Sequence, residues 1–140
     1  MPCIVYQNKN KFLTDEIIKK MGEMVLKEIK APRAEVSVHL VGTKKMIQLN
    51  NNYRGIKKIT DVLSFATESR VENDWGDIFI CLPQIKKQAK EYGINLNEEF
   101  SRMLTHGILH LSGLDHLEKK ESEIMFKKQE KIVKKIMKLC

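Results

Sequence analysis

The chain has 140 residues, the length of one ordinary domain, and is 42% hydrophobic and 31% charged. This is the composition of a soluble globular protein, and no apolar run approaches the roughly 20 residues that a membrane-spanning helix needs. The N-terminus also lacks the basic stretch and long apolar core of a signal peptide. We therefore expect a cytoplasmic protein that makes no contact with a membrane.

A net charge of +7 favours association with a polyanion such as nucleic acid. The charge argument is weak by itself, because lysine-rich helices often only keep a surface soluble. The three cysteines (Cys3, Cys81 and Cys140) are far apart and form no C-x-x-C pair, which argues against disulfides and against a thiolate zinc site. Cys3 and Cys81 are interpreted as small apolar strand residues.

Hydrophobic periodicity predicts one α+β domain over residues 1–140, without a linker or an internal repeat. In chain order, the expected strands cover residues 4–7, 35–41, 62–67 and 77–82. The expected helices cover residues 14–29, 43–52, 83–93, 97–113 and 117–139. The prediction is a mixed sheet of about four strands packed with about five helices. Thr14 and Thr43 are expected to cap two helices, and Asn97 is the expected start of another. Gly93 and Gly113 are the expected helix ends.

Three of the four histidines lie within eleven residues, at His106, His110 and His116. On a helix, residues four apart project from nearly the same face, so the rings of His106 and His110 can converge on one ion. Gly113 can end the helix at low steric cost, and the turn after it can bring His116 back to the same ion. Three imidazoles leave a coordination position open for water, as in catalytic zinc sites.

The position of the two histidines relative to the apolar stripe of this helix favours a metal site over a structural role. A histidine on an amphipathic helix is usually solvated or structural, but His106 and His110 both lie on the flank of the stripe. The stripe consists of Phe100, Met103, Leu104, Gly107, Ile108 and Leu111. Because a helix-ending glycine and a third histidine follow, the sequence predicts a metal site. His39, on a predicted strand, is interpreted as structural.

The donor set indicates the metal. Three neutral nitrogen donors suit Zn²⁺, although Ni²⁺ or another divalent transition metal also binds imidazole. Zinc bound in this way makes its water acidic enough to ionise near neutral pH. Asp115, beside the third histidine, is expected to orient a ligand ring or to contact this water. The alternative for Asp115 is a turn carboxylate that caps the last helix. His106 and Asp115 are expected catalytic residues.

The histidine spacing occurs in two families. It matches the metzincin peptidase pattern H-E-x-x-H-x-x-G-x-x-H, but Gly107 stands where those peptidases carry their general-base glutamate. The chain resembles the YbeY endoribonucleases, or ribosomal RNA maturation factors, far more closely. Three blocks carry that resemblance: residues 49–55 leading into 60–65, residues 76–80, and residues 103–116.

The resemblance implies a metal-dependent endoribonuclease that is specific for single strands. It implies a role in 3′-end maturation of 16S ribosomal RNA and in ribosome quality control. The small ribosomal subunit and its assembly factors are the implied partners, and no DNA is expected. The implied metal ligands are His106, His110 and His116, and the implied functional arginine is Arg54.

The chemistry around Arg54 agrees with RNA cleavage. A planar guanidinium can meet two phosphate oxygens as negative charge builds on them, so Arg54 is expected to act in both catalysis and substrate binding. Asn50, Lys57 and Lys58 are expected to contact RNA in a polar, cationic groove. The alternatives are an exposed turn arginine and solvated lysines. The nucleophile stays open between water and the 2′-hydroxyl of the RNA.

Two other functions compete with RNA cleavage. One is a metal-dependent hydrolase of another substrate, such as a metzincin-like peptidase or an amidase, although Gly107 argues against a peptidase. The other is a non-catalytic, zinc-containing protein that associates with the ribosome. A structural zinc site normally has a fourth protein ligand, and no candidate is evident nearby in the sequence.

Overall fold

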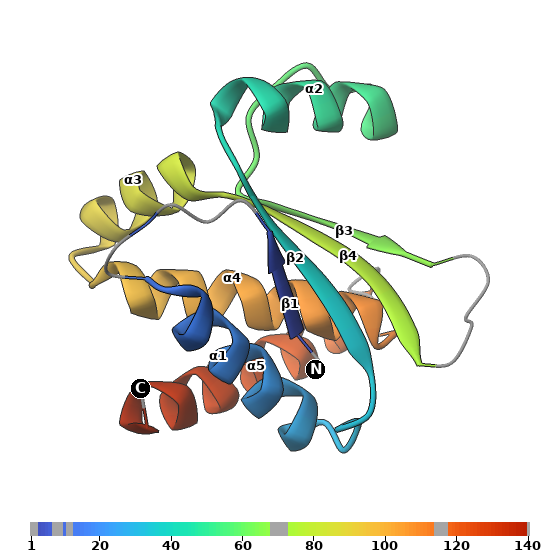
Figure 1. The fold of residues 1–140 in the computed structure, drawn as a ribbon, viewed down its shortest axis with the longest axis vertical. Coiled ribbons are helices and arrows are strands. Elements are labelled where there is room, and N and C mark those ends of the chain that lie inside the picture. The colour runs from blue at the N-terminus through green and yellow to red at the C-terminus, as the bar shows by residue number, and fades with distance from the viewer. Residues whose placement is uncertain (1–2, 7–9, 11–12, 68–72, 114–117, 140) are drawn as a thin grey trace.

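The computed structural model describes residues 3–6, 10, 13–67, 73–113 and 118–139 of the chain. These residues form a four-stranded sheet and five helices (Figure 1). In chain order they are β1 (Cys3–Tyr6), α1 (Asp15–Glu28), β2 (Glu35–Val41), α2 (Thr43–Arg54), β3 (Val62–Ala66), β4 (Asp74–Cys81), α3 (Leu82–Tyr92), α4 (Leu96–Leu111) and α5 (Lys119–Leu139). The predicted α+β fold is confirmed, and each predicted strand overlaps an observed one.

The sheet is mixed, with the strand order β1-β2-β4-β3. β1, β2 and β4 run parallel to one another, and β3 pairs antiparallel with β4. Parallel neighbours need a crossover connection, which α1 supplies between β1 and β2. β3 therefore forms one edge of the sheet.

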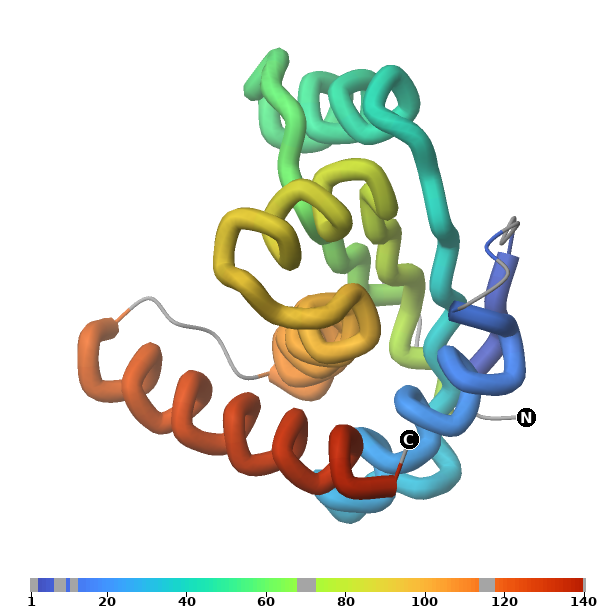
Figure 2. Tube along the Cα trace, turned by 90° about the vertical axis from the view of Figure 1, so that its left-hand side faces the viewer, coloured from blue at the N-terminus to red at the C-terminus, as the bar shows by residue number. Residues whose placement is uncertain are grey.

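The helices cover the two faces of the sheet unequally (Figures 1 and 2). The larger core lies between the sheet and α1, α4 and α5, and it contains Val38, Ile78 and Ile80. A smaller core lies on the other face, where Met46 and Leu49 of α2 pack on the sheet. Because successive residues of a strand point to opposite faces, β4 contributes side chains to both cores.

Of the two predicted caps, that at Thr14 is confirmed and that at Thr43 is wrong, because Gly42 is the N-cap of α2 and Thr43 is its first helical residue. The Thr14 hydroxyl accepts a hydrogen bond from the Ile17 N–H at 3.3 Å, which confirms the predicted cap of α1. The predicted start of α4 at Asn97 is wrong. Asn95 caps this helix instead, because its side-chain oxygen accepts from the Glu98 N–H at 2.8 Å.

The predicted helix ends at two glycines are confirmed. Gly93 follows α3 in the left-handed conformation, with a φ of 67°. Gly113 has a φ of 102°, and its N–H donates to the His110 carbonyl at 3.1 Å. Both values are readily adopted by glycine and strained for other residues.

α4 packs closely on the sheet at Gly107. The Ser64 hydroxyl on β3 donates to the Gly107 carbonyl at 3.2 Å. A β-carbon at residue 107 would lie only 3.0 Å from Ile78 Cγ2 and 3.1 Å from Ser64 Oγ. Glycine is therefore the residue that lets α4 lie at this depth.

An ionic cluster joins α4 to α5. Arg102 Nε donates to both carboxylate oxygens of Glu130, at 2.9 and 3.2 Å, and the guanidinium also contacts Glu98 and Glu99. The hydrogen bond to Glu130 is the main reason why the pKa of Arg102 lies above its ordinary value, against the opposing effect of burial. Burial also acts to raise the pKa of Glu130, but hydrogen bonds from Arg102 and Gln129, with the Arg102 charge, hold that pKa below its ordinary value.

None of the described helices is long and apolar enough to cross a membrane. Cys3 and Cys81 are buried and unpaired, in agreement with their interpretation as small apolar strand residues. Burial raises the pKa of the Cys3 thiol to about 12, so this thiol stays protonated at neutral pH. Cys140 lies outside the described residues.

We expect the added β-carbon of Gly107→Ala to cost about 1–2 kcal/mol in packing, because it lies too close to Ile78 and Ser64. Alanine gains about 1 kcal/mol in helix propensity, so the free energy of unfolding should fall by no more than about 1 kcal/mol in total. Urea denaturation measures the difference. The same substitution in an Ile78→Ala background should cost much less, since the crowding methyl groups are gone. An equal cost in both backgrounds would contradict the close-packing explanation.

The lowered pKa of Glu130 predicts that the link between α4 and α5 weakens in acid. A carboxylate whose pKa is lower in the folded state stabilises the fold above its unfolded-state pKa, and this contribution disappears as the pH falls toward the folded-state value. The difference in free energy of unfolding between wild type and Glu130→Gln should therefore be largest well above pH 4.5, the ordinary pKa of a glutamate, and should shrink as the pH falls below it. Urea midpoints measured across this range test the expectation, and a difference independent of pH would refute it.

Candidate active site

The two predicted metal ligands on α4 converge. The Nε2 atoms of His106 and His110 lie within hydrogen-bonding distance, 3.1 Å apart, and their rings meet at an interplanar angle of 73°. Two nitrogens bound to a tetrahedral zinc ion at about 2.0–2.1 Å would be roughly 3.3 Å apart. The donor type and the spacing of this pair therefore fit two ligands of one ion.

The second ring nitrogen of His106 contacts α5. His106 Nδ1 lies 2.9 Å from Oε1 of Gln129, whose side chain is buried. An imidazole that donates through Nδ1 keeps Nε2 as the atom that can bind a metal. His106 thus has one nitrogen held by the protein and the other directed toward His110.

A groove brings Arg54 together with the two histidines. This cavity of about 450 Å³ is lined by the end of α2, by β3 with the residues just before it, and by α4. Arg54 is the last residue of α2, and Gly55 caps the helix in the left-handed conformation. Asp61 and Ser64 also line the groove. The arginine and the imidazoles, which are far apart in the sequence, therefore share one surface.

The three predicted RNA contacts near Arg54 are placed differently. Asn50 is only 2% exposed, and its Nδ2 donates to the Lys58 carbonyl at 3.0 Å. This burial corrects the expectation that Asn50 contacts RNA, because its side chain instead holds the loop after Arg54 in place. Lys57 and Lys58 are exposed on that loop, and their contact with RNA stays a prediction.

His116 and Asp115 lie outside the described residues, so the third ligand and the neighbouring carboxylate stay predictions. Within the described ranges, no group of three or more histidine, cysteine, aspartate or glutamate side chains is placed to hold a metal. His106 and His110 are thus the part of the predicted ligand set that the described chain contains.

Two residues beside the histidines, Asp61 and Gln129, were not predicted to have a role. Asp61 lines the groove, and its Oδ1 accepts from the Val62 N–H at 2.8 Å, which fixes the carboxylate at the start of β3. Gln129 holds the His106 ring. The sequence did carry a signal for Gln129, because this amide interrupts the buried stripe of α5. That stripe otherwise consists of Met125, Ile132, Val133 and Ile136.

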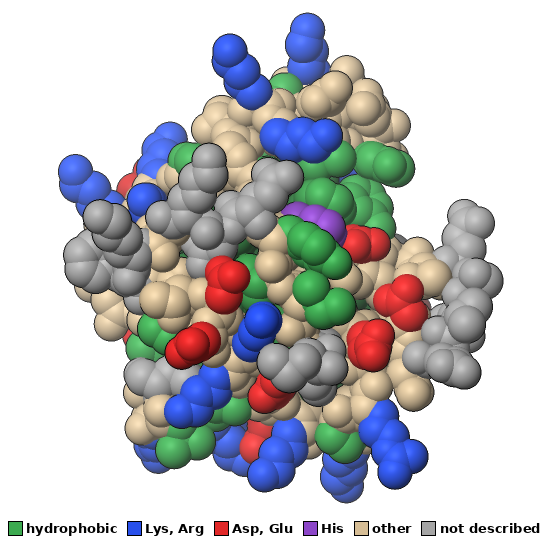
Figure 3. Space-filling model, viewed as in Figure 1, with side chains coloured by type: hydrophobic (Ala, Val, Ile, Leu, Met, Phe, Trp, Pro, Cys, Tyr) green, Lys and Arg blue, Asp and Glu red, His purple; other side chains and the backbone are tan. Residues whose placement is uncertain are grey.

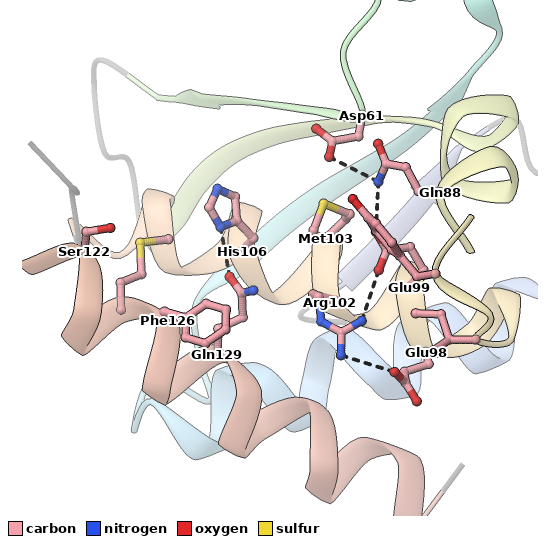
Figure 4. A pocket seen from close by; sticks show the side chains of 13 residues that line it. Asp61, Gln88, Glu98, Glu99, Arg102, Met103, His106, Ser122, Phe126 and Gln129 are labelled. Atoms are coloured by element: carbon pink, nitrogen blue, oxygen red, sulfur yellow. Dashed lines mark hydrogen bonds and ion pairs between the residues drawn. The ribbon is translucent and has the colours of Figure 1, made fainter. Parts of the chain in front are cut away.

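A second cavity of about 600 Å³ adjoins His106 between α3, α4 and α5 (Figure 4). His106 and Asp61 line both cavities. Apolar surface comes partly from Phe126, which is 61% exposed. On its polar side, Gln88 Nε2 donates to Glu99 Oε2 at 2.8 Å and lies 3.4 Å from Asp61 Oδ2. The two cavities therefore meet at His106 and Asp61.

The fourth histidine lies on the other face of the sheet. His39 Nε2 is 2.8 Å from Asp77 Oδ1, and its ring stacks on Phe79 at a centroid distance of 4.4 Å. The Phe79 ring in turn meets the Phe65 ring edge-on, and the ring centroids of Tyr53 and Phe65 are 4.5 Å apart. These rings pack on one another, so His39 belongs to an aromatic cluster rather than to the groove.

Basic side chains are not gathered on the face drawn in Figure 3. Lysine and arginine side chains lie over α2 at the top, over α3 at the left and over α1 and α5 at the bottom, with acidic side chains among them. The net charge of +7 therefore does not mark an RNA-binding surface on this face.

Comparison with known proteins identifies the family. Residues 4–137 match the model of the endoribonuclease YbeY family. The endoribonuclease YbeY of Sulfurihydrogenibium sp. (strain YO3AOP1) is 38% identical over 131 residues, which cover 91% of this chain and 86% of the relative. That of Desulforamulus reducens is 36% identical over an alignment 149 positions long, gaps included, which covers 97% of each chain. A solution structure of a Thermotoga maritima protein superposes with a TM-score of 0.70 at 34% identity, covering 97% of this chain and 89% of that one. The resemblance seen in the sequence is confirmed, and the chain belongs to the endoribonuclease YbeY family.

Proposed function

We propose that this protein is a metal-dependent endoribonuclease that cleaves single-stranded RNA in the 3′-end maturation of 16S ribosomal RNA. The observation that carries the proposal is the groove in which Arg54 lies with His106 and His110. Its relatives are named as endoribonucleases, which supports RNA as the substrate. The small ribosomal subunit and its assembly factors are the partners we expect, in the cytoplasm.

His106, His110 and His116 are the residues that would hold the metal, with zinc as the ion that three imidazoles suit. The 3.1 Å spacing of the first two Nε2 atoms supports this assignment. A divalent metal bound there supplies Lewis acidity toward a phosphate and toward water. Asp115, next to the third ligand, would orient a ligand ring.

Arg54 would bind the scissile phosphate and stabilise the charge that develops on its oxygens. Its guanidinium is exposed beside the groove, where it can donate to two phosphate oxygens at once. Lys57 and Lys58 would contact neighbouring phosphates of the strand. The product ends identify the nucleophile, because a 2′,3′-cyclic phosphate requires attack by the 2′-hydroxyl and excludes attack by water.

The peptidase alternative loses support at residue 107. Metzincins carry their general-base glutamate at this position, whereas a β-carbon here would meet Ile78 and Ser64 of the sheet. Residue 107 therefore points into packed protein and cannot present a base to the groove. A non-catalytic zinc protein stays distinguishable, because it would bind RNA without cutting it.

We expect Arg54→Ala to slow cleavage of a single-stranded ribosomal RNA fragment by about 10²–10³-fold, since one preorganised donor to the developing charge is lost. Arg54→Lys should recover only part of the rate, because a lysine cannot meet two oxygens in the fixed geometry of a guanidinium. Single-turnover cleavage by zinc-loaded protein measures both rates.

Arg33→Ala is the matched control, since Arg33 is exposed and is not among the groove residues. It should cut at the wild-type rate. If Arg54→Ala and His110→Ala also cut at that rate, a contaminating nuclease explains the activity and the proposed function is wrong.

Removal of either described ligand should lower the zinc content. His106→Ala and His110→Ala should each bind markedly less than the wild-type amount, because two imidazoles hold zinc more weakly than three. His39→Ala provides a matched histidine control, because His39 pairs with Asp77 outside the groove. Elemental analysis after dialysis gives the stoichiometry, and unchanged zinc in both ligand variants would refute the ligand assignment.

A further inference from the structure

The His106 ring is held by a side chain from another helix. Gln129 of α5 places its Oε1 2.9 Å from His106 Nδ1 (Figure 4). Gln129 is 5% exposed and occupies the otherwise apolar stripe of α5. A buried amide is costly unless its polar atoms are paired, and both ends of this amide have partners.

The orientation of the Gln129 amide follows from its second partner. Its Nε2 donates to Glu130 Oε2 at 3.3 Å. An ionised carboxylate only accepts hydrogen bonds, so the NH₂ end of the amide must face Glu130 and the oxygen must face His106. The oxygen of an amide also only accepts, so His106 must donate through Nδ1.

Glu130 is itself fixed by α4. Arg102 donates hydrogen bonds to its carboxylate from Nε at 2.9 Å and from Nη2 at 3.0 Å. Arg102 precedes His106 by about one helical turn. The chain of contacts therefore leaves α4 at Arg102, crosses to Glu130 and Gln129 on α5, and returns to α4 at His106. Arg102 only donates hydrogen bonds and the Glu130 carboxylate only accepts them. The Gln129 amide does both, since it donates to Glu130 and accepts from His106.

We propose that Gln129 is a positioning residue that holds His106 as the Nδ1–H tautomer, so that the Nε2 lone pair faces the metal position. The inference rests on the proposed metal site. An unrestrained neutral histidine favours the opposite Nε2–H form, which blocks the coordinating nitrogen. The hydrogen bond on the other ring nitrogen selects the tautomer, and such partners of metal ligands are typically worth 10–100-fold in metal affinity.

Gln129→Met tests the proposal, because methionine keeps the length of the side chain and removes the acceptor. We expect this variant to bind zinc about 10–100-fold more weakly in competition with a chromophoric chelator. In the metal-free protein, long-range ¹H–¹⁵N spectra should show that His106 shifts away from the Nδ1–H form. The exchanged pair, Gln129→Glu with Glu130→Gln, restores an acceptor for His106 and keeps a donor between the two side chains, so it should restore both the tautomer and most of the affinity.

Glu130→Gln tests whether the orientation of the Gln129 amide matters or only the space that its side chain fills. The neutral amide no longer forces the NH₂ end of Gln129 toward it, so the His106 tautomer should become mixed while Gln129 itself is intact. His39 is the internal reference in the same spectra and should not change. Circular dichroism and urea denaturation confirm that each variant is folded.

A folded Gln129→Met protein that keeps the Nδ1–H tautomer and the wild-type zinc affinity would overturn the proposal. A loss of zinc affinity with an unchanged tautomer would also overturn it, because Gln129 would then act only as a structural residue. Neither measurement uses RNA. Absence of cleavage by the wild type would therefore count against the proposed function, while the tautomer series would still decide the role of Gln129.

Discussion

The close seat of α4 on β3 and β4 is the constraint on which the site depends. Gly107 sits against Ile78 and accepts a hydrogen bond from Ser64, and a side chain at this position would push the helix away. Because a helix is rigid, this contact also fixes its rotation about its own axis. His106 precedes the contact by one residue and His110 follows it by three, so the rotation that buries Gly107 turns both rings toward the β3 edge.

α2 completes the site from the other face of the sheet. Met46 and Leu49 pack α2 on that face, and its last residue, Arg54, reaches the groove beside β3. The return loop is held by the buried Asn50 amide, which donates to the Lys58 carbonyl. Arginine and imidazoles thus meet only because two helices on opposite faces both extend to the same sheet edge. The edge position of β3 makes this meeting possible, since a further strand there would fill the groove.

Sequence patterns correctly predicted the features that depend on neighbouring residues of the chain. Strand alternation and the spacing of four between His106 and His110 depend on backbone geometry alone, so both survived in the structure. The start of α4 was missed although a signal existed: Asn95 and Glu98 have capping-box spacing, whereas a start at Asn97 would put the core residue Phe100 at that position. The burial of Asn50 and the contact of Gln129 depend on which distant element packs against them, which periodicity along one helix does not encode.

The ionic cluster between α4 and α5 is better explained by its effect on the orientation of the Gln129 amide than by a contribution to the stability of the fold. Arg102 faces three glutamates, so the cluster is partly buried and carries excess negative charge, and apolar residues of similar volume would often stabilise such an interface at least as well. Apolar residues, however, could not dictate which end of the Gln129 amide faces His106. A fixed carboxylate at Glu130 can, because it accepts and never donates. The polar groups in this interface are therefore explained if His106, as a proposed metal ligand, has to present its Nε2 atom. Packing alone would not select that nitrogen.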